Sequence, residues 1–203
     1  RIRQRFCCDT GPCGLPRFSR RKSSNERTPG DNIGTTSLPG YYIDYHTTIR
    51  LASPSPITME AYRYGGLCNR TREDWNDQTA EMLTSEGLSR DEADGSRARW
   101  CYYQGKAGNE KACILIVASP SNLNYPEPLR VWDKTVNKPA GDVMWNFSPT
   151  KQKAFTLEPG KELSLSYRIY VWTRTSTLLR QKCCPISNVI EFLLKQLTIC
   201  RAR

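Results

Sequence analysis

Several stretches between residues 41 and 172 have an apolar side chain at every second position, and none shows the spacing of a helix. The clearest run is the last one, in which Leu163, Leu165, Tyr167, Ile169 and Val171 alternate with Ser164, Ser166, Arg168, Tyr170 and Trp172. Residues 41–51 show the same two-residue period. This alternation is typical of strands with one buried face. It predicts an all-β fold, an antiparallel β-sandwich that could form part of a larger supersandwich.

Further strands are predicted at 57–64, 67–72, 81–84, 99–103, 112–118, 144–147 and 154–157. Polar loops are expected at 75–78 and 88–96, and a proline-rich loop at 120–128 should cross a sheet end or edge. Residues 158–161, Glu-Pro-Gly-Lys, match a type II turn, with Pro at its second position and Gly at its third.

The excess positive charge lies outside the β-rich stretch. The chain has 203 residues and a net charge of +10, but residues 1–40 and 174–203 each contribute +5, and residues 41–173 contain sixteen basic and sixteen acidic residues. The charge is therefore not a basic face of the domain, and no nucleic-acid partner is predicted. We predict a disordered basic flank at 1–40, one domain at 41–172 and a foreign tail at 173–203. Asn188 and Glu191 can form a capping box for a short amphipathic helix in that tail.

The cysteines and the single histidine predict no metal site and no cofactor. Nine cysteines without regular spacing do not favour a disulfide scaffold, and Cys68, Cys101 and Cys113 lie in strand-like runs, where we expect small buried side chains. Cys7, Cys8 and Cys13 fit no structural zinc pattern. His46 points away from the apolar side of its strand and is expected to be solvated. No run of about twenty apolar residues is present, so no membrane span is predicted.

Several short motifs occur in a fixed order across about two-thirds of the chain. They are Tyr-Gly-Gly-Leu at 64–67 with Arg70, Ser-Glu-Gly at 85–87, Arg-Ala-Arg-Trp at 97–100 with Gly105, Pro-Ser-Asn at 120–122 with Tyr-Pro-Glu-Pro-Leu-Arg-Val-Trp at 125–132, Asn-Phe-Ser-Pro at 146–149, and Leu-Glu-Pro-Gly-Lys at 157–161. In this order they resemble the PmoA-like family, largely uncharacterised proteins labelled "methane oxygenase PmoA". The resemblance implies a carbohydrate-associated β-sandwich and a periplasmic or extracellular location.

The chain departs from the family pattern at three points. Ser119 stands where the family has a histidine, Thr173-Arg174 replaces a terminal Asp-Gly pair, and residues 1–40 lack the family's histidine-bearing half. The resemblance therefore covers only a C-terminal half, and the flanks are most simply explained as sequence out of frame or joined from elsewhere. One histidine cannot supply the ligands of a copper oxygenase, so that activity is excluded.

The motifs single out eight candidate site residues. The predicted ligand-binding residues are Arg70, Arg97, Trp100, Asn122, Tyr125, Arg130 and Trp132, and the predicted catalytic acid or base is Glu86. Sugars bind through aromatic faces on their C–H patches and through charged or amide groups on their hydroxyls. The alternative is structural, with paired charges and aromatic rings that fill the core. Catalysis would need a second carboxylate facing Glu86, for which Glu127 and Asp133 are candidates.

Three functions stay open at this point. The first is a binding or substrate-positioning module for carbohydrate in a truncated chain. The second is a sugar-active hydrolase or isomerase whose histidine-bearing half is missing. The third is a non-functional fragment whose unpaired edge strands would cause aggregation.

Overall fold

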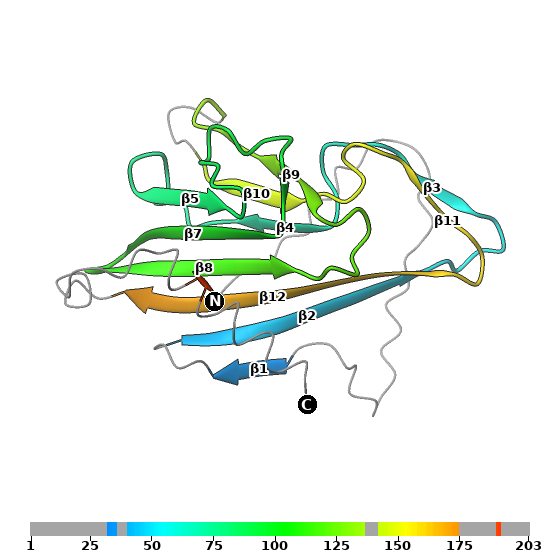
Figure 1. Ribbon diagram of the computed structural model, residues 1–203, viewed down its shortest axis with the longest axis horizontal. Coiled ribbons are helices and arrows are strands. Elements are labelled where there is room, and N and C mark those ends of the chain that lie inside the picture. The colour runs from blue at the N-terminus through cyan, green and yellow to red at the C-terminus, as the bar shows by residue number, and fades with distance from the viewer. Residues whose placement is uncertain (1–31, 36–39, 137–141, 175–189, 192–203) are drawn as a thin grey trace.

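The computed structural model describes residues 32–35, 40–136, 142–174 and 190–191. All of its twelve elements are strands, and their sheets are antiparallel and packed together (Figure 1). The predicted all-β antiparallel fold is therefore confirmed. In this part of the chain, no helix has the length and apolar character needed to cross a membrane.

The larger sheet has six strands in the order β1-β2-β12-β8-β7-β5. Their bounds are β1 Asn32–Thr35, β2 Gly40–Arg50, β5 Ala80–Thr84, β7 Trp100–Ala107, β8 Glu110–Ala118 and β12 Glu162–Arg174. Strand β12, which has the clearest alternation in the sequence, lies between β2 and β8 and pairs with both. The predicted turn before it is present, with Gly160 at φ 75° and the Lys161 N–H donating to the Glu158 carbonyl at 3.0 Å.

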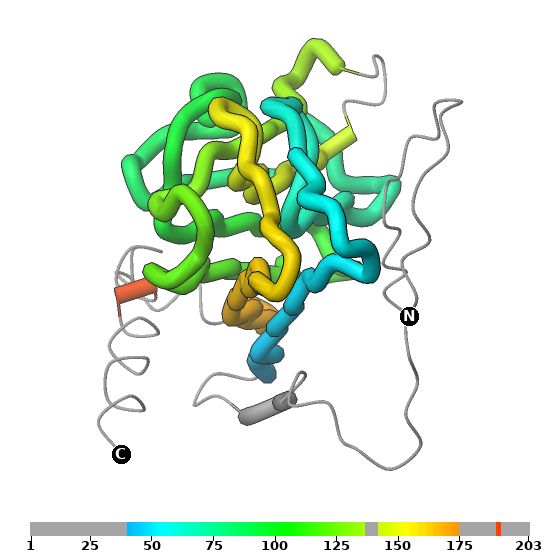
Figure 2. The backbone as a smooth tube through the Cα atoms, turned by 90° about the vertical axis from the view of Figure 1, so that its right-hand side faces the viewer, coloured from blue at the N-terminus to red at the C-terminus, as the bar shows by residue number. Residues whose placement is uncertain are grey.

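The smaller sheet has four strands in the order β4-β10-β9-β6. Their bounds are β4 Leu67–Arg70, β6 Arg97–Ala98, β9 Glu127–Val131 and β10 Met144–Phe147. A separate pair, β3 Ile57–Met59 and β11 Phe155–Leu157, runs side by side in cyan and yellow in Figure 2. Strand β3 is shorter than the predicted strand at 57–64, and the Tyr62 N–H donates instead to the Thr150 carbonyl oxygen at 3.3 Å.

The main core lies between the two sheets and is rich in aromatic rings. Tyr103 of β7 stacks on Trp145 of β10 with ring centroids 5.2 Å apart. Phe147 contacts Trp145 edge to face, and Tyr167 of β12 lies 5.7 Å from Phe147. Trp75 is only 2% exposed and belongs to the same cluster, although residues 75–78 were predicted to be a polar loop. Its ring covers Gly105, where a Cβ atom would collide with it.

A second apolar cluster covers the opposite face of the larger sheet. Tyr170 and Trp172 of β12 belong to it, so the face of β12 that was predicted to be polar is buried in the C-terminal part of the strand. Ile190 is 2% exposed and packs in the same cluster. This residue of the predicted foreign tail therefore contacts the domain.

The flanks differ from the prediction in one further place. Strand β1 pairs with residues 41–44 of β2, although it lies in the segment 1–40 that was predicted to be disordered. The free backbone edge of β2 provides the hydrogen-bonding groups for this pairing. Residues 1–31 and most of the predicted C-terminal helix lie outside the described residues.

The inner cysteines and the histidine can be placed directly. Cys101 and Cys113 are buried free thiols, as predicted, and Cys68 is half-buried. His46 is exposed on the polar side of β2, where its Nδ1 lies 2.7 Å from the Ser166 hydroxyl oxygen.

Candidate functional site

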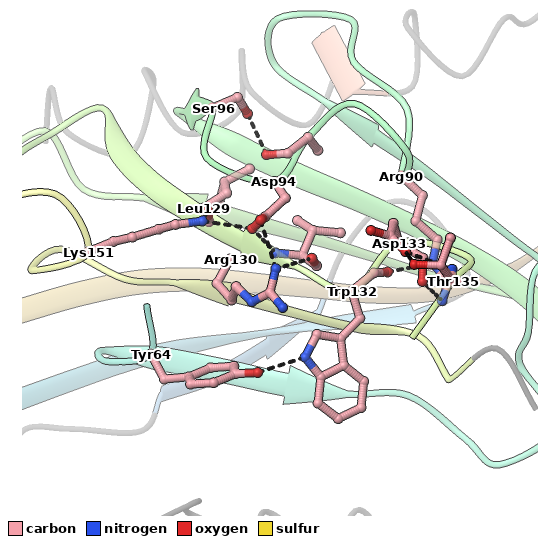
Figure 3. A network of polar contacts seen from close by, with 12 residues as sticks. Tyr64, Arg90, Asp94, Ser96, Leu129, Arg130, Trp132, Asp133, Thr135 and Lys151 are labelled. Atoms are coloured by element: carbon pink, nitrogen blue, oxygen red, sulfur yellow. Dashed lines mark hydrogen bonds and ion pairs between the residues drawn. The ribbon is translucent and has the colours of Figure 1, made fainter. Parts of the chain in front are cut away.

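Three of the predicted residues, Arg70, Arg130 and Trp132, come together on the outer side of the smaller sheet. Figure 3 shows Arg130 and Trp132 beside Tyr64. Successive side chains of a strand point to opposite faces. Leu129 and Val131 of β9 are 0% and 1% exposed in the core, so Arg130 points outward. Trp132 follows directly after β9, and Arg70 ends β4, two strands away.

Two aromatic residues that the sequence analysis did not select complete this surface. The Trp132 indole N–H donates to the Tyr64 hydroxyl at 2.9 Å, and the Tyr62 ring meets the Tyr64 ring edge to face at 5.9 Å. The Arg70 guanidinium lies 4.9 Å from the Trp132 ring centroid, and that of Arg63 lies 5.3 Å from the Tyr64 ring centroid. We call Tyr62, Arg63, Tyr64, Arg70 and Trp132 the aromatic–arginine face.

Asn146 of β10 holds the segment that carries Tyr62 and Tyr64. Its side-chain amide donates to the carbonyl oxygens of Gly65 and Leu67 and accepts from the Gly65 N–H. Gly66 has φ +59°, and a Cβ atom there would collide with the Phe147 carbonyl oxygen. The second glycine of the Tyr-Gly-Gly-Leu motif is thus explained by its positive φ and its close approach to the end of β10.

Asp94 fixes Arg130 beside this face. Its carboxylate accepts from Arg130 Nη1 and Lys151 Nζ, each at 2.7 Å, and from the Val131 N–H at 3.0 Å. Burial alone would raise the pKa of Asp94, but hydrogen bonds from Lys151 and Val131 outweigh it and lower the pKa. The Arg130 and Lys151 side chains are only 15% and 14% exposed, so both act mainly within the protein.

Arg90 anchors the backbone that follows β9. It is 6% exposed and donates to the carbonyl oxygens of Trp132 at 2.7 Å and Asp133 at 3.3 Å (Figure 3). It also donates to the Asp142 carbonyl oxygen at 2.6 Å. The sequence analysis placed Arg90 and Asp94 in a polar loop, because nothing local marks an arginine that reaches carbonyl groups more than forty residues away.

Asn122 lies in the interior and holds a buried carboxyl group. Its amide donates to Glu127 Oε1 at 2.7 Å, and the Tyr167 hydroxyl donates to Glu127 Oε2 at 2.9 Å. Asn122 also accepts from the Ser166 N–H at 2.8 Å. Glu127 is 0% exposed, and burial raises its pKa to about 7 even though both hydrogen bonds favour the charged form. Glu127 therefore cannot serve as a second carboxylate at a surface site.

Arg97 of β6 binds the proline-rich loop before β9, to which Tyr125 belongs. Arg97 Nη1 donates to the carbonyl oxygens of Asn124 at 2.9 Å and Pro126 at 2.8 Å, and Nη2 donates to Gln152 Oε1 at 2.8 Å. Tyr125 is half-buried and packs against the main core. Both residues therefore shape this loop.

Glu86 and Trp100 lie away from the aromatic–arginine face. Glu86 follows β5 in an exposed turn, where it accepts from the Ser85 hydroxyl at 3.0 Å and lies 3.5 Å from Arg99 Nη2. Trp100 packs against the second apolar cluster, on the opposite face of the larger sheet. Asp133, the other candidate partner for Glu86, accepts instead from Thr135, and these hydrogen bonds lower its pKa.

The predicted residues thus divide into one surface group and several separate structural positions. In the described part of the chain, no group of three or more His, Cys, Asp and Glu residues is arranged to hold a metal ion. The aromatic–arginine face is the arrangement best suited to contact a ligand, because it presents rings and guanidinium groups together.

Comparisons with known proteins give a family for this chain. A search of the curated proteins and a search of the solved structures returned no significant match. A family model matches residues 26–180, which includes strand β1 and extends past the end of β12. The match covers most of the chain, and the chain therefore belongs to this family, which is described as a family of unknown function (DUF6807).

Proposed function

We propose that this chain is a carbohydrate-binding module and that the aromatic–arginine face is its binding surface. The observation that carries the proposal is the contact of three rings on one surface, beside two guanidinium groups. Tyr62 is 50% exposed, the largest exposure of a bulky apolar residue in the described part of the chain. Aromatic rings of this kind bind the C–H patches of sugars, and neighbouring guanidinium groups donate hydrogen bonds to their oxygens.

The face is held in place before any ligand binds. Asn146 fixes the 62–66 segment, Arg90 fixes the backbone at Trp132, and the Trp132 indole fixes Tyr64. A surface that is already ordered loses less conformational entropy on binding. This rigidity supports a binding role for an otherwise small contact area.

The charges beside the face favour binding over catalysis. Asp142 is ion-paired with Arg70 at 2.7 Å, and Asp94 is ion-paired with Arg130 and Lys151. A general acid or base needs a carboxyl group that can reach the substrate. Glu86 is paired with Arg99 at a different edge, which leaves the hydrolase or isomerase alternative without a described residue that supports it.

Calorimetric titration of the full chain against a panel of neutral and acidic oligosaccharides tests the proposal. Tyr62→Ala should weaken binding by about tenfold or more, equivalent to about 1.4 kcal/mol, and leave the melting temperature nearly unchanged because the ring is half exposed. Trp132→Phe keeps a ring but loses the N–H that fixes Tyr64, so its effect should be smaller.

Trp100→Phe is the matched control, because this aromatic residue lies on the opposite side of the larger sheet and should bind sugar as the wild type does. Wild-type affinity in Tyr62→Ala, or the absence of binding to every sugar of the panel, would overturn the proposal.

A further inference from the structure

We infer that the ligand of the aromatic–arginine face is an anionic glycan, one whose sugars carry carboxylate or sulfate groups. This inference rests on the proposed function of the same face and names its ligand class. It begins from the charge around the face. Residues 41–173 are neutral as a whole, yet Arg63, Arg70, Arg90, Arg130 and Lys151 lie around this face with Asp94, Asp133 and Asp142, a local net charge of +2.

Two of these cations are already neutralised inside the protein. Arg130 and Lys151 share the carboxylate of Asp94, and their side chains are nearly covered. The exposed cations are Arg63 and Arg70, which flank Tyr64 and Trp132. The charge that can reach a ligand therefore lies next to the rings.

Arg63 and Arg70 retain donors for a ligand. The contact described for the Arg63 guanidinium is with the Tyr64 ring, and no ion pair is found for it among the described residues. Arg70 is 50% exposed and donates to Asp142 through Nη2, whereas its Nε and Nη1 have no hydrogen bond in the described part of the chain. Arginine donates through a planar fork that fits carboxylate and sulfate oxygens.

The chemistry of these groups favours an acidic sugar over a neutral one. A neutral hydroxyl both donates and accepts hydrogen bonds, so a neutral sugar is best recognised by a mixture of donors and acceptors. The exposed charged groups of this face are guanidinium donors, and the nearby carboxylates of Asp94 and Asp142 are ion-paired. A carboxylate or sulfate group accepts hydrogen bonds from guanidinium groups and has no proton to donate.

The test compares each acidic glycan with its own neutralised form. Oligogalacturonate is titrated against the same oligosaccharide with its carboxyl groups methyl-esterified, and oligo-carrageenan is titrated against its desulfated form. We expect the acidic form of at least one pair to bind about tenfold tighter at low salt and to lose this advantage as salt rises. The two pairs distinguish a carboxylate from a sulfate ligand.

Arg63→Gln and Arg70→Gln should each reduce the preference for the acidic form, and the double variant should remove it while Tyr62 still supports weak binding. Arg99→Gln is the matched control. It also removes one exposed arginine, 55% exposed and 3.5 Å from Glu86, but from a different edge, and should keep the preference. A thermal melt of each variant checks that it is folded.

Two outcomes separate this inference from the proposed function. Equal binding of the acidic and neutralised forms, or an unchanged preference in the double variant, would overturn the inference and leave the sugar-binding face in place. Failure of every acidic and neutral sugar to bind would overturn both.

Discussion

The two faces of strand β9 differ in what surrounds their polar side chains. On the inner face, Glu127 lies between the sheets with Leu129 and Val131 and is closed off by Asn122 and Tyr167. On the outer face, Arg130 and Trp132 both contact the surface residue Tyr64. Neighbours in one short motif therefore have different roles, and their place in the pleat decides which of them a ligand can reach.

The inner face should dominate the stability of the protein. Leu129 is 0% exposed in the main core, and Leu129→Ala should lower the free energy of unfolding by about 2 to 5 kcal/mol through lost burial and the remaining cavity. Denaturant titration measures this change. The control Lys153→Ala, at an exposed position, should stay within about 0.5 kcal/mol of the wild type. A similar small loss in Leu129→Ala would contradict the placement of this face in the core.

The buried carboxyl group predicts a pH dependence with an unusual direction. The pKa of Glu127 is about 7 in the fold, above its ordinary value of 4.5, so the folded state binds this proton more tightly than the unfolded state. Stability should therefore fall as pH rises from about 4.5 to about 7 and then level off, by up to about 3 kcal/mol for this group.

Glu127→Gln isolates this contribution, because glutamine has nearly the same shape and can accept from Asn122 and donate to the Tyr167 oxygen. The variant should match the wild type near pH 4.5 and become relatively more stable toward pH 7. Denaturant titrations across this range measure the difference. A constant difference between the two proteins would show that Glu127 does not titrate in this window.

The alternation in the sequence was enough to predict strands β2 and β12, and the Pro-Gly pair was enough to predict the turn at Gly160, because period and turn chemistry are local properties. It did not predict that Tyr170 and Trp172 are buried, since their cover comes from a distant part of the chain. The alternation also did not predict the exposure of Tyr62. The strand predicted at 57–64 ends at Met59, so the strand period does not apply to Tyr62.

Of the predicted site residues, only Arg70, Arg130 and Trp132 lie together, on the outer side of the smaller sheet, and their role in binding stays a prediction. Asn122 belongs to the same motifs, but its amide turns inward to Glu127 and Ser166. A sequence motif shows which residues are polar, but it does not show to which face of the sheet their side chains point. Contacts such as those of Arg90 and Asp94 depend on segments that meet only in the folded chain.

A substitution beside the outer face should change stability less than the substitutions on the inner face. Its effect should also change with pH in the opposite direction to that of Glu127. Asp94→Asn keeps an acceptor for the Val131 N–H but loses the ion pairs with Arg130 and Lys151. We expect a loss of about 1 kcal/mol near pH 7, a modest value because the Asp94 side chain is 37% exposed and solvent screens these pairs.

The pKa of Asp94 lies below its ordinary value of 3.8, so its contribution is complete above that pH and is lost as pH falls through the folded pKa. The difference between wild type and Asp94→Asn should therefore shrink in acid, over a range where Glu127 is already protonated. Asp91→Asn, which breaks the exposed pair with Lys134 in the same loop, is the control and should change stability less. A difference that persists unchanged in acid would mean that packing, and not charge, joins Asp94 to the outer face.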